Sequence, residues 1–157
     1  MKKLFLFLAL AGGFTAMSQT VINLDDRENA QELIDSLAVF YTPALTADST
    51  TGIMSARYLE YEMEFIEWRF DMSAYLNERD FFWNGPTKLQ LYVYAKEGGE
   101  IDFVLYQFGN GSMDEQRYFA FGPLLEKYVK EHNIPLSEKA SQPFSQCGPV
   151  VMMDSDK

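Results

Sequence analysis

The stretch that decides the fold is residues 88–108, Lys-Leu-Gln-Leu-Tyr-Val-Tyr-Ala-Lys-Glu-Gly-Gly-Glu-Ile-Asp-Phe-Val-Leu-Tyr-Gln-Phe. Apolar and polar side chains alternate along its first half, and a second run rich in apolar and aromatic residues follows the Gly-Gly pair. A period of two predicts β-strands, and a glycine-containing loop between two such runs predicts a β-hairpin. Its first strand carries Leu89, Leu91, Val93 and Ala95 on one face.

The length of the hairpin loop fixes the register of the two strands. A two-residue loop, Gly98-Gly99, sets Ala95 opposite Asp102, whereas the three-residue loop Glu97–Gly99 sets Ala95 opposite Ile101. The longer loop gives one apolar face and lets Gly99 take the left-handed conformation, so we favour it. It also sets the pairs Val93 with Phe103, Leu91 with Leu105 and Lys96 with Glu100.

This register places three tyrosines, Tyr92, Tyr94 and Tyr106, on the other face of the hairpin. Open to solvent, they would make a contact surface for a sugar, a peptide or a protein, because tyrosine combines apolar area with a hydroxyl. The alternative is that another element, such as residues 54–79, covers this face.

Three other segments have helical spacing. Residues 25–40 predict a helix capped by Asp25 or Asp26. Residues 54–79 fit both a helical stripe and a bulged strand, and the absence of Gly and Pro favours the helix. Ser112 and Glu115 form a capping box for a third helix, which Gly122-Pro123 should kink or split and which ends near His132.

A short final strand is expected over Pro149–Met153, with a frayed tail from Asp154. The predicted fold class is therefore α+β: a small antiparallel sheet with a ββαβ core, packed by two or three helices. Residues 88–153 resemble the C-terminal domain of the TonB energy transducers and its exported relatives, through the hairpin with its Glu-Gly-Gly-Glu-Ile turn, the helix after Ser112 and the final Pro-Val-Val strand. We carry no activity or binding residue over from it, because the expected leader is cleavable and no Pro-rich spacer follows.

The N-terminus has the pattern of a cleavable signal peptide over residues 1–18. Lys2 and Lys3 precede an apolar run, Leu4 to Ala11, which is too short to span a bilayer, and Ala16 and Ser18 form a small-x-small cleavage site. Residues 19–157 would then be a single exported domain, periplasmic or extracellular, with no stable membrane anchor and no lipidated cysteine.

The charge of the chain excludes one class of partner. The formal net charge is −10, and loss of Lys2 and Lys3 would make it −12. Such a surface repels nucleic acid and anionic lipid head groups, but charge alone names no partner. The partner expected for the domain is an unknown protein, peptide or carbohydrate.

No motif in the chain specifies a reaction. Cys147 and His132 are the only residues that could pair as a thiol nucleophile and its base. If Cys147 is exposed, a reactive thiol that senses redox state or forms an interchain disulfide is favoured over a catalytic nucleophile. We assign no catalytic residue, cofactor or metal, since one His and one Cys make a poor ligand set. Two groups of carboxylates are expected to be solvated or to stabilise helix ends: Asp25-Asp26, Asp114-Glu115 and Asp154 with Asp156, and separately Glu60, Glu62, Glu64 and Glu67.

The sequence thus predicts an exported, soluble, acidic, non-enzymatic binding or interaction protein of unknown ligand. The alternative is a small exported hydrolase or thiol-dependent enzyme that uses Cys147 and His132.

Overall fold

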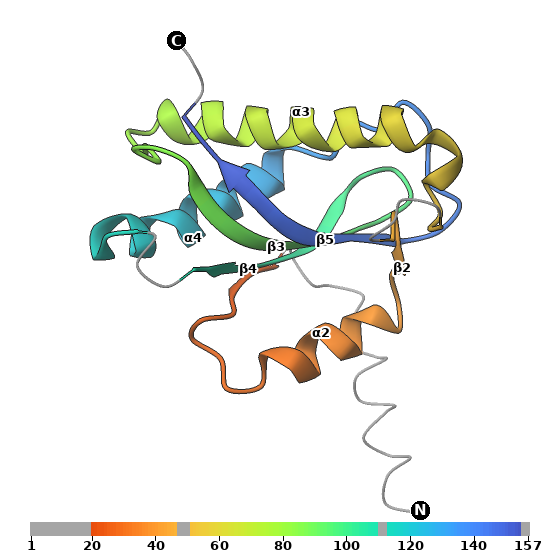
Figure 1. The fold of residues 1–157 in the computed structure, drawn as a ribbon, viewed down its shortest axis with the longest axis horizontal. Coiled ribbons are helices and arrows are strands. Elements are labelled where there is room, and N and C mark those ends of the chain that lie inside the picture. Colours follow the sequence, from red (N-terminus) through yellow and green to blue (C-terminus); the bar gives the residue numbers. More distant parts are fainter. Residues whose placement is uncertain (1–19, 47–50, 110–112, 155–157) are drawn as a thin grey trace, which may run out of the picture.

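The computed structural model describes residues 20–46, 51–109 and 113–154. They form a five-stranded sheet with helices on both faces (Figure 1). The predicted signal peptide, residues 1–18, lies outside the described residues. In chain order the elements are β1 (Thr20–Asn23), α2 (Ala30–Ala38), β2 (Thr42–Pro43), η2 (Ser55–Arg57), α3 (Tyr58–Asn77), β3 (Thr87–Ala95), β4 (Ile101–Phe108), α4 (Glu115–Glu131) and β5 (Phe144–Met152).

The sheet is mixed, with strand order β1-β4-β3-β5-β2. The central strand, β3, pairs antiparallel with both β4 and β5, whereas β1 runs parallel to β4 and β2 runs parallel to β5. The α+β class is confirmed, but the expectation of an antiparallel sheet is wrong at its two outer strands. These strands precede the hairpin in the chain, and neither has enough alternating residues to be recognised from sequence.

The hairpin has the predicted loop but a different register beyond it. Gly99 takes a φ of 85°, and Lys96 and Glu100 face each other with 2.7 Å between Nζ and Oε1. Ala95 pairs with Ile101 as expected, yet Tyr94 pairs with Phe103, so Asp102 is an extra residue in β4. This β-bulge shifts every later pair by one position. Leu91 therefore lies opposite Tyr106 and Val93 opposite Val104.

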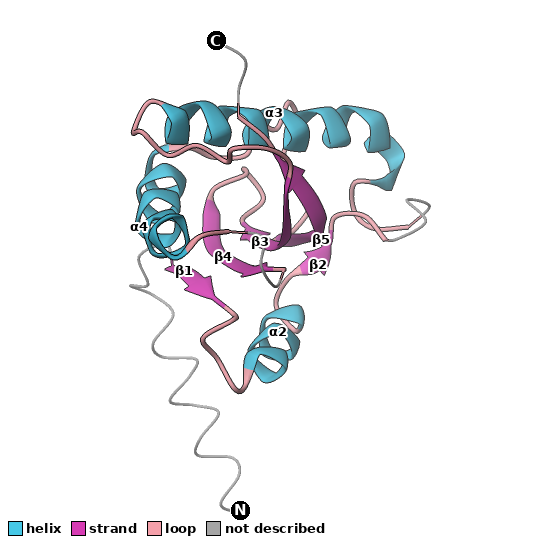
Figure 2. Ribbon diagram, turned by 60° about the vertical axis from the view of Figure 1, so that its left-hand side comes forward, coloured by secondary structure: helices cyan, strands magenta, loops and turns pink. Residues whose placement is uncertain are grey.

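The bulge distributes β4 between two cores. Helices α3 and α4 cover one face of the sheet, and α2 covers the other (Figure 2). Val104, Tyr106 and Phe108 belong to the larger core beneath α3 and α4, whereas Phe103 and Leu105 belong to the smaller one. The smaller core also contains Leu24, Leu37, Tyr41 and Tyr94.

Helix α4 is anchored by a cluster of aromatic rings around the fully buried Phe121. Its ring centroid lies 5.0 Å from that of Tyr106 and 5.2 Å from that of Phe108. A Cβ at Gly122 would come within 2.8 Å of the Tyr106 hydroxyl, so this glycine lets the helix approach the sheet closely. Pro123 lies inside one continuous helix, so of the expected kink or split the split is wrong, and the kink stays a prediction.

The caps of two helices differ from those expected. The side chain of Asp114 accepts a hydrogen bond from the Arg117 amide and caps α4, while the predicted cap, Ser112, lies outside the described residues. Helix α2 begins after Asn29, and Asp25 instead accepts a hydrogen bond from the Phe108 amide.

The final strand is longer than expected, and it includes Cys147. Asp154 beyond it is not frayed: its carboxylate accepts hydrogen bonds from the Trp83 amide at 2.7 Å and the Asn84 amide at 3.1 Å. On the outer side of β5, only Phe144 and Ser145 pair with β2. The Ser145 carbonyl points outward and accepts a hydrogen bond from the Ala44 amide, so Cys147, Pro149 and Val151 turn their backbone the same way. No described strand pairs with this part of the edge, and Pro149 offers no donor there.

The helix favoured over residues 54–79 is confirmed as η2 and α3, but one of its carboxylates is not solvated. Glu64 is buried, forms an ion pair with Arg57, and accepts a hydrogen bond from the Ser137 amide at 2.8 Å. Burial alone would raise the pKa of Glu64, but the hydrogen bonds from Arg57 and Ser137 hold it below its usual value. Glu64 thus ties α3 to the loop after α4.

We expect Glu64→Gln to lower the free energy of unfolding at pH 7 by about 1–3 kcal/mol, because a charged, hydrogen-bonded carboxylate is lost. The pKa of Glu64 is lower in the folded protein than in the unfolded chain, where it is roughly 4.3. The Glu64 carboxylate therefore stabilises the folded protein fully at pH values above the unfolded pKa. This contribution disappears as the pH falls through the folded pKa. Urea denaturation should therefore show the stabilities of the two proteins converging as the pH falls through the folded pKa of Glu64. Glu67→Gln, at an exposed position of the same helix, is the control and should change stability little at either pH. A deficit that persists undiminished in acid would contradict this role for the Glu64 charge.

Candidate functional site

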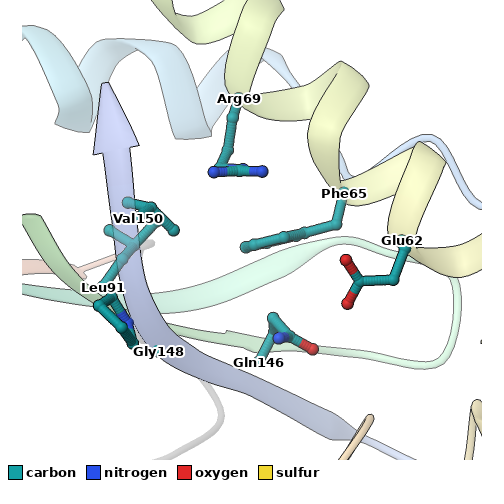
Figure 3. Close-up of a pocket in the computed structure, with 8 residues that line it drawn as sticks. Glu62, Phe65, Arg69, Leu91, Gln146, Gly148 and Val150 are labelled. Atoms are coloured by element: carbon teal, nitrogen blue, oxygen red, sulfur yellow. The ribbon is translucent and has the colours of Figure 1, made fainter. Parts of the chain in front are cut away.

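A small pocket lies between α3 and the middle of β5 (Figure 3). Its volume is about 150 Å³. Glu62, Phe65 and Arg69 line it from the helix, at positions that share one flank of α3. Gln146, Gly148 and Val150 line it from alternate positions of β5, together with Pro149 and Leu91.

Arg69 is the cation of this pocket. Its guanidinium carbon lies 5.6 Å from the centroid of the Phe65 ring, and its Nε is buried with no hydrogen-bond partner among the described residues. None of the ion pairs among the described residues includes Arg69. Burial lowers the pKa of Arg69, and the charge of Glu62 opposes that shift. The side-chain oxygen of Gln146 is likewise buried without a partner. The pocket thus holds polar groups that the described part of the chain leaves unsatisfied.

The pocket exists because β5 carries a glycine where its face meets α3. A Cβ placed on Gly148 would meet no atom within 4 Å, so the missing side chain leaves open space. No sequence motif marks this site. Its only sequence signal is the spacing of Glu62, Phe65 and Arg69, and the strand that completes it lies about eighty residues later in the chain.

A second feature is the solvent side of α3. Four apolar residues, hereafter the outer stripe, follow each other at helical spacing: Leu59, Met63, Ile66 and Phe70. Leu59 is 74%, Met63 64% and Phe70 59% exposed. The opposite side of the helix is the buried one predicted from sequence, with Tyr61, Phe65, Trp68 and Met72 in the core. Helix α3 is therefore apolar on two opposite sides.

Acidic side chains border the outer stripe. Glu60, Glu67 and Asp71 are exposed along one flank, and Glu62 and Arg69 lie on the other flank, beside the pocket. The glutamates were expected to form a solvated side of the helix, and the apolar stripe between them was not predicted. Its signal was present in the sequence as a second run with steps of 4, 3 and 4 residues.

The structure does not bring Cys147 and His132 together. His132 stacks on Tyr128 at the end of α4, with 4.4 Å between ring centroids, beneath α3. Cys147 pairs with Tyr92 and belongs to the opposite face of the sheet. Although Cys147 is exposed, surrounding protein excludes enough water from the thiol to raise its pKa to about 11. At neutral pH it is a thiol and a weak nucleophile.

The three tyrosines do not form a common exposed surface. Tyr94 is 1% and Tyr106 4% exposed, and the bulge places them on opposite faces of the sheet. Tyr94 lies beneath Tyr41, at 5.2 Å between ring centroids, and burial raises its pKa. Burial likewise raises the pKa of Tyr106 to about 12. The covering element for Tyr92 and Tyr94 is α2 with its following loop, so the expectation that residues 54–79 would cover them is wrong.

Across residues 20–46, 51–109 and 113–154, no three His, Cys, Asp or Glu side chains gather in a way that could hold a metal ion. Asp25 and Asp114, each from a predicted acidic pair, accept backbone hydrogen bonds instead. Within the same described ranges, none of the helices has the length and apolar character required to cross a bilayer.

Tyr94 should behave as a core residue. We expect Tyr94→Ala to lower the free energy of unfolding by roughly 3–5 kcal/mol, because it removes a fully buried ring. Tyr92→Ala, at the half-buried neighbour on the same face, should cost clearly less. Chemical denaturation of both variants checks this, and equal, small losses would mean that α2 does not cover Tyr94.

Comparison with known proteins gave no match: no protein-family model fits the chain, and neither a curated protein nor a solved structure is significantly similar to it. The resemblance of residues 88–153 to the TonB C-terminal domain therefore stays a prediction.

Proposed function

We propose that this chain is an exported, non-enzymatic binding protein and that the outer stripe of α3 is its contact surface for a protein partner. The observation that carries the proposal is the exposure of Leu59, Met63 and Phe70 on one side of a single helix. A helix on the surface of a domain normally turns polar side chains outward, and contiguous exposed apolar groups are typical of interaction sites.

The outer stripe offers enough apolar surface to contribute to binding. Full burial of a Leu, Met or Phe side chain is worth about 1.5–3 kcal/mol. Met63 lies at the centre of the stripe, and methionine adapts its shape to different partner surfaces. Because the stripe follows a straight helix, its geometric complement is the apolar side of a second helix.

The charges beside the stripe favour a basic partner. Glu60, Glu67 and Asp71 border it, so lysines or arginines flanking the apolar side of a partner helix would meet carboxylates. A second copy of this chain is a poorer fit. In a symmetric antiparallel pair of α3 helices, the acidic flank of one copy faces the acidic flank of the other. We therefore infer that the partner is a basic amphipathic helix.

Two further observations support a binding role. The separation of Cys147 and His132 removes the geometry that the enzymatic alternative requires. The signal-peptide pattern of residues 1–18 favours a partner outside the cytoplasm. The ββαβ order of residues 88–153, on which the TonB resemblance rests, concerns the scaffold of the protein only. It identifies no binding residue.

The test is a titration with a designed helical peptide that has leucines at i, i+4, i+7 and i+11 and lysines beside them. Met63→Lys should weaken peptide binding by about tenfold or more, because it places a charge in the centre of the apolar contact. Phe119→Lys, at a residue on α4 that is 65% exposed, is the matched control and should leave binding unchanged. Isothermal titration calorimetry at two salt concentrations should also show weaker binding at high salt.

Two results would contradict the proposal. One is equal affinity of the peptide for the Met63→Lys and Phe119→Lys variants, which would mean that the outer stripe is not the contact surface. The other is a stable dimer that Met63→Lys dissociates, measured by sedimentation equilibrium, which would mean that a second copy covers the stripe.

A further inference from the structure

The pocket between α3 and β5 has a chemistry of its own, distinct from that of the outer stripe. Arg69 brings a positive charge into a partly dehydrated site, and no carboxylate of the described residues pairs with it. Removing a guanidinium from water is unfavourable unless an anion or several hydrogen bonds replace the water. In a chain with a formal net charge of −10, an unpaired cation in a pocket points to a ligand that carries a negative group.

The opposite end of the pocket calls for a positive group. Glu62 projects toward the space from about two turns before Arg69 in α3, and the buried side-chain oxygen of Gln146 lies across from it (Figure 3). Both groups accept hydrogen bonds, and Glu62 adds a negative charge. A ligand with an ammonium group at this end and a carboxylate at the Arg69 end would satisfy both.

The size and the walls of the pocket limit the ligand further. A volume of about 150 Å³ matches a cavity that holds a molecule of benzene's size, about six non-hydrogen atoms. Phe65, Leu91 and Val150 add apolar surface to the walls of the pocket. Alanine has this size, carries an ammonium group and a carboxylate on the same carbon atom, and has one methyl group.

We propose that this pocket is a binding site for a small zwitterion, namely a free α-amino acid of about the size of alanine. Arg69 binds its carboxylate, Glu62 and Gln146 accept hydrogen bonds from its ammonium group, and the apolar walls contact its side chain. This site goes beyond the proposed protein-binding function and does not depend on it.

The first experiment compares three probes that differ by one charged group: L-alanine, propionate, which lacks the ammonium group, and ethylamine, which lacks the carboxylate. Side-chain NMR signals of Arg69 Nε–H and the Gln146 amide should shift saturably with L-alanine. Each truncated probe should bind at least about tenfold more weakly, because each leaves one charged group of the pocket unpaired. Equal responses to L-alanine and propionate would overturn the zwitterion and leave a general carboxylate site.

The second experiment separates the pocket from unspecific charge effects. Arg69→Gln should weaken L-alanine binding about tenfold or more. Arg79→Gln is the matched control, since Arg79 also stacks on an aromatic ring of α3, with its Cζ 3.4 Å from the Tyr75 centroid, but lies outside the pocket. It should leave binding unchanged.

A third variant keeps all the charges and removes only the space. The Cβ position of Gly148 is open, so Gly148→Val should fill the pocket while the protein keeps its thermal unfolding midpoint. We expect this variant to lose L-alanine binding. If it binds as tightly as the unaltered protein, or if no probe shifts the Arg69 signal at millimolar concentration, the pocket holds ordered water only and the proposal fails.

Discussion

The whole arrangement depends on one extra residue in a strand. Asp102 bulges out of the pairing between β3 and β4, and every residue of β4 beyond it changes face as a result. Without the bulge, Tyr106 and Phe108 would leave the rings around Phe121, and α4 would lose its anchor. The Asp102 carboxylate accepts a hydrogen bond from the Tyr41 hydroxyl at 2.9 Å, so the bulge also holds the loop that follows α2 against the sheet. One local irregularity thus assigns side chains to two cores.

The same residue explains how far the sequence could predict the fold. Local patterns predict the hairpin loop, the helix over residues 54–79 and the class of the fold. The signals involved, Gly99 and the stripe that contains Tyr61, Phe65 and Trp68, depend only on residues that are close in the sequence. The bulge does not, because its partner Tyr41 lies 61 residues away in the chain. The placement of α2 over Tyr94 depends on that contact too, and this is why three tyrosines expected on one surface are divided between the faces.

The candidate sites were hidden for a different reason. Residues 58–77 are apolar on two opposite sides of the helix, and either side alone is enough to predict an amphipathic helix. The side with Tyr61, Phe65 and Trp68 is the core, and the helical pattern that it forms does not reveal that Leu59, Met63 and Phe70 form a second, exposed side. The pocket could not be found from sequence, because it requires β5 to cross beneath α3 with a glycine at position 148. Proximity of this kind arises from tertiary packing and leaves no periodic signal.

The open edge of β5 has a consequence for behaviour at high concentration. An exposed sheet edge is a template on which other chains can polymerise as additional strands. Here the central position of that edge is Pro149, which lacks an amide hydrogen, and a growing fibril would find a gap in its hydrogen-bond ladder at this point. Pro149 thus makes amyloid-like growth unfavourable along an edge of the sheet that no described strand covers beyond β2.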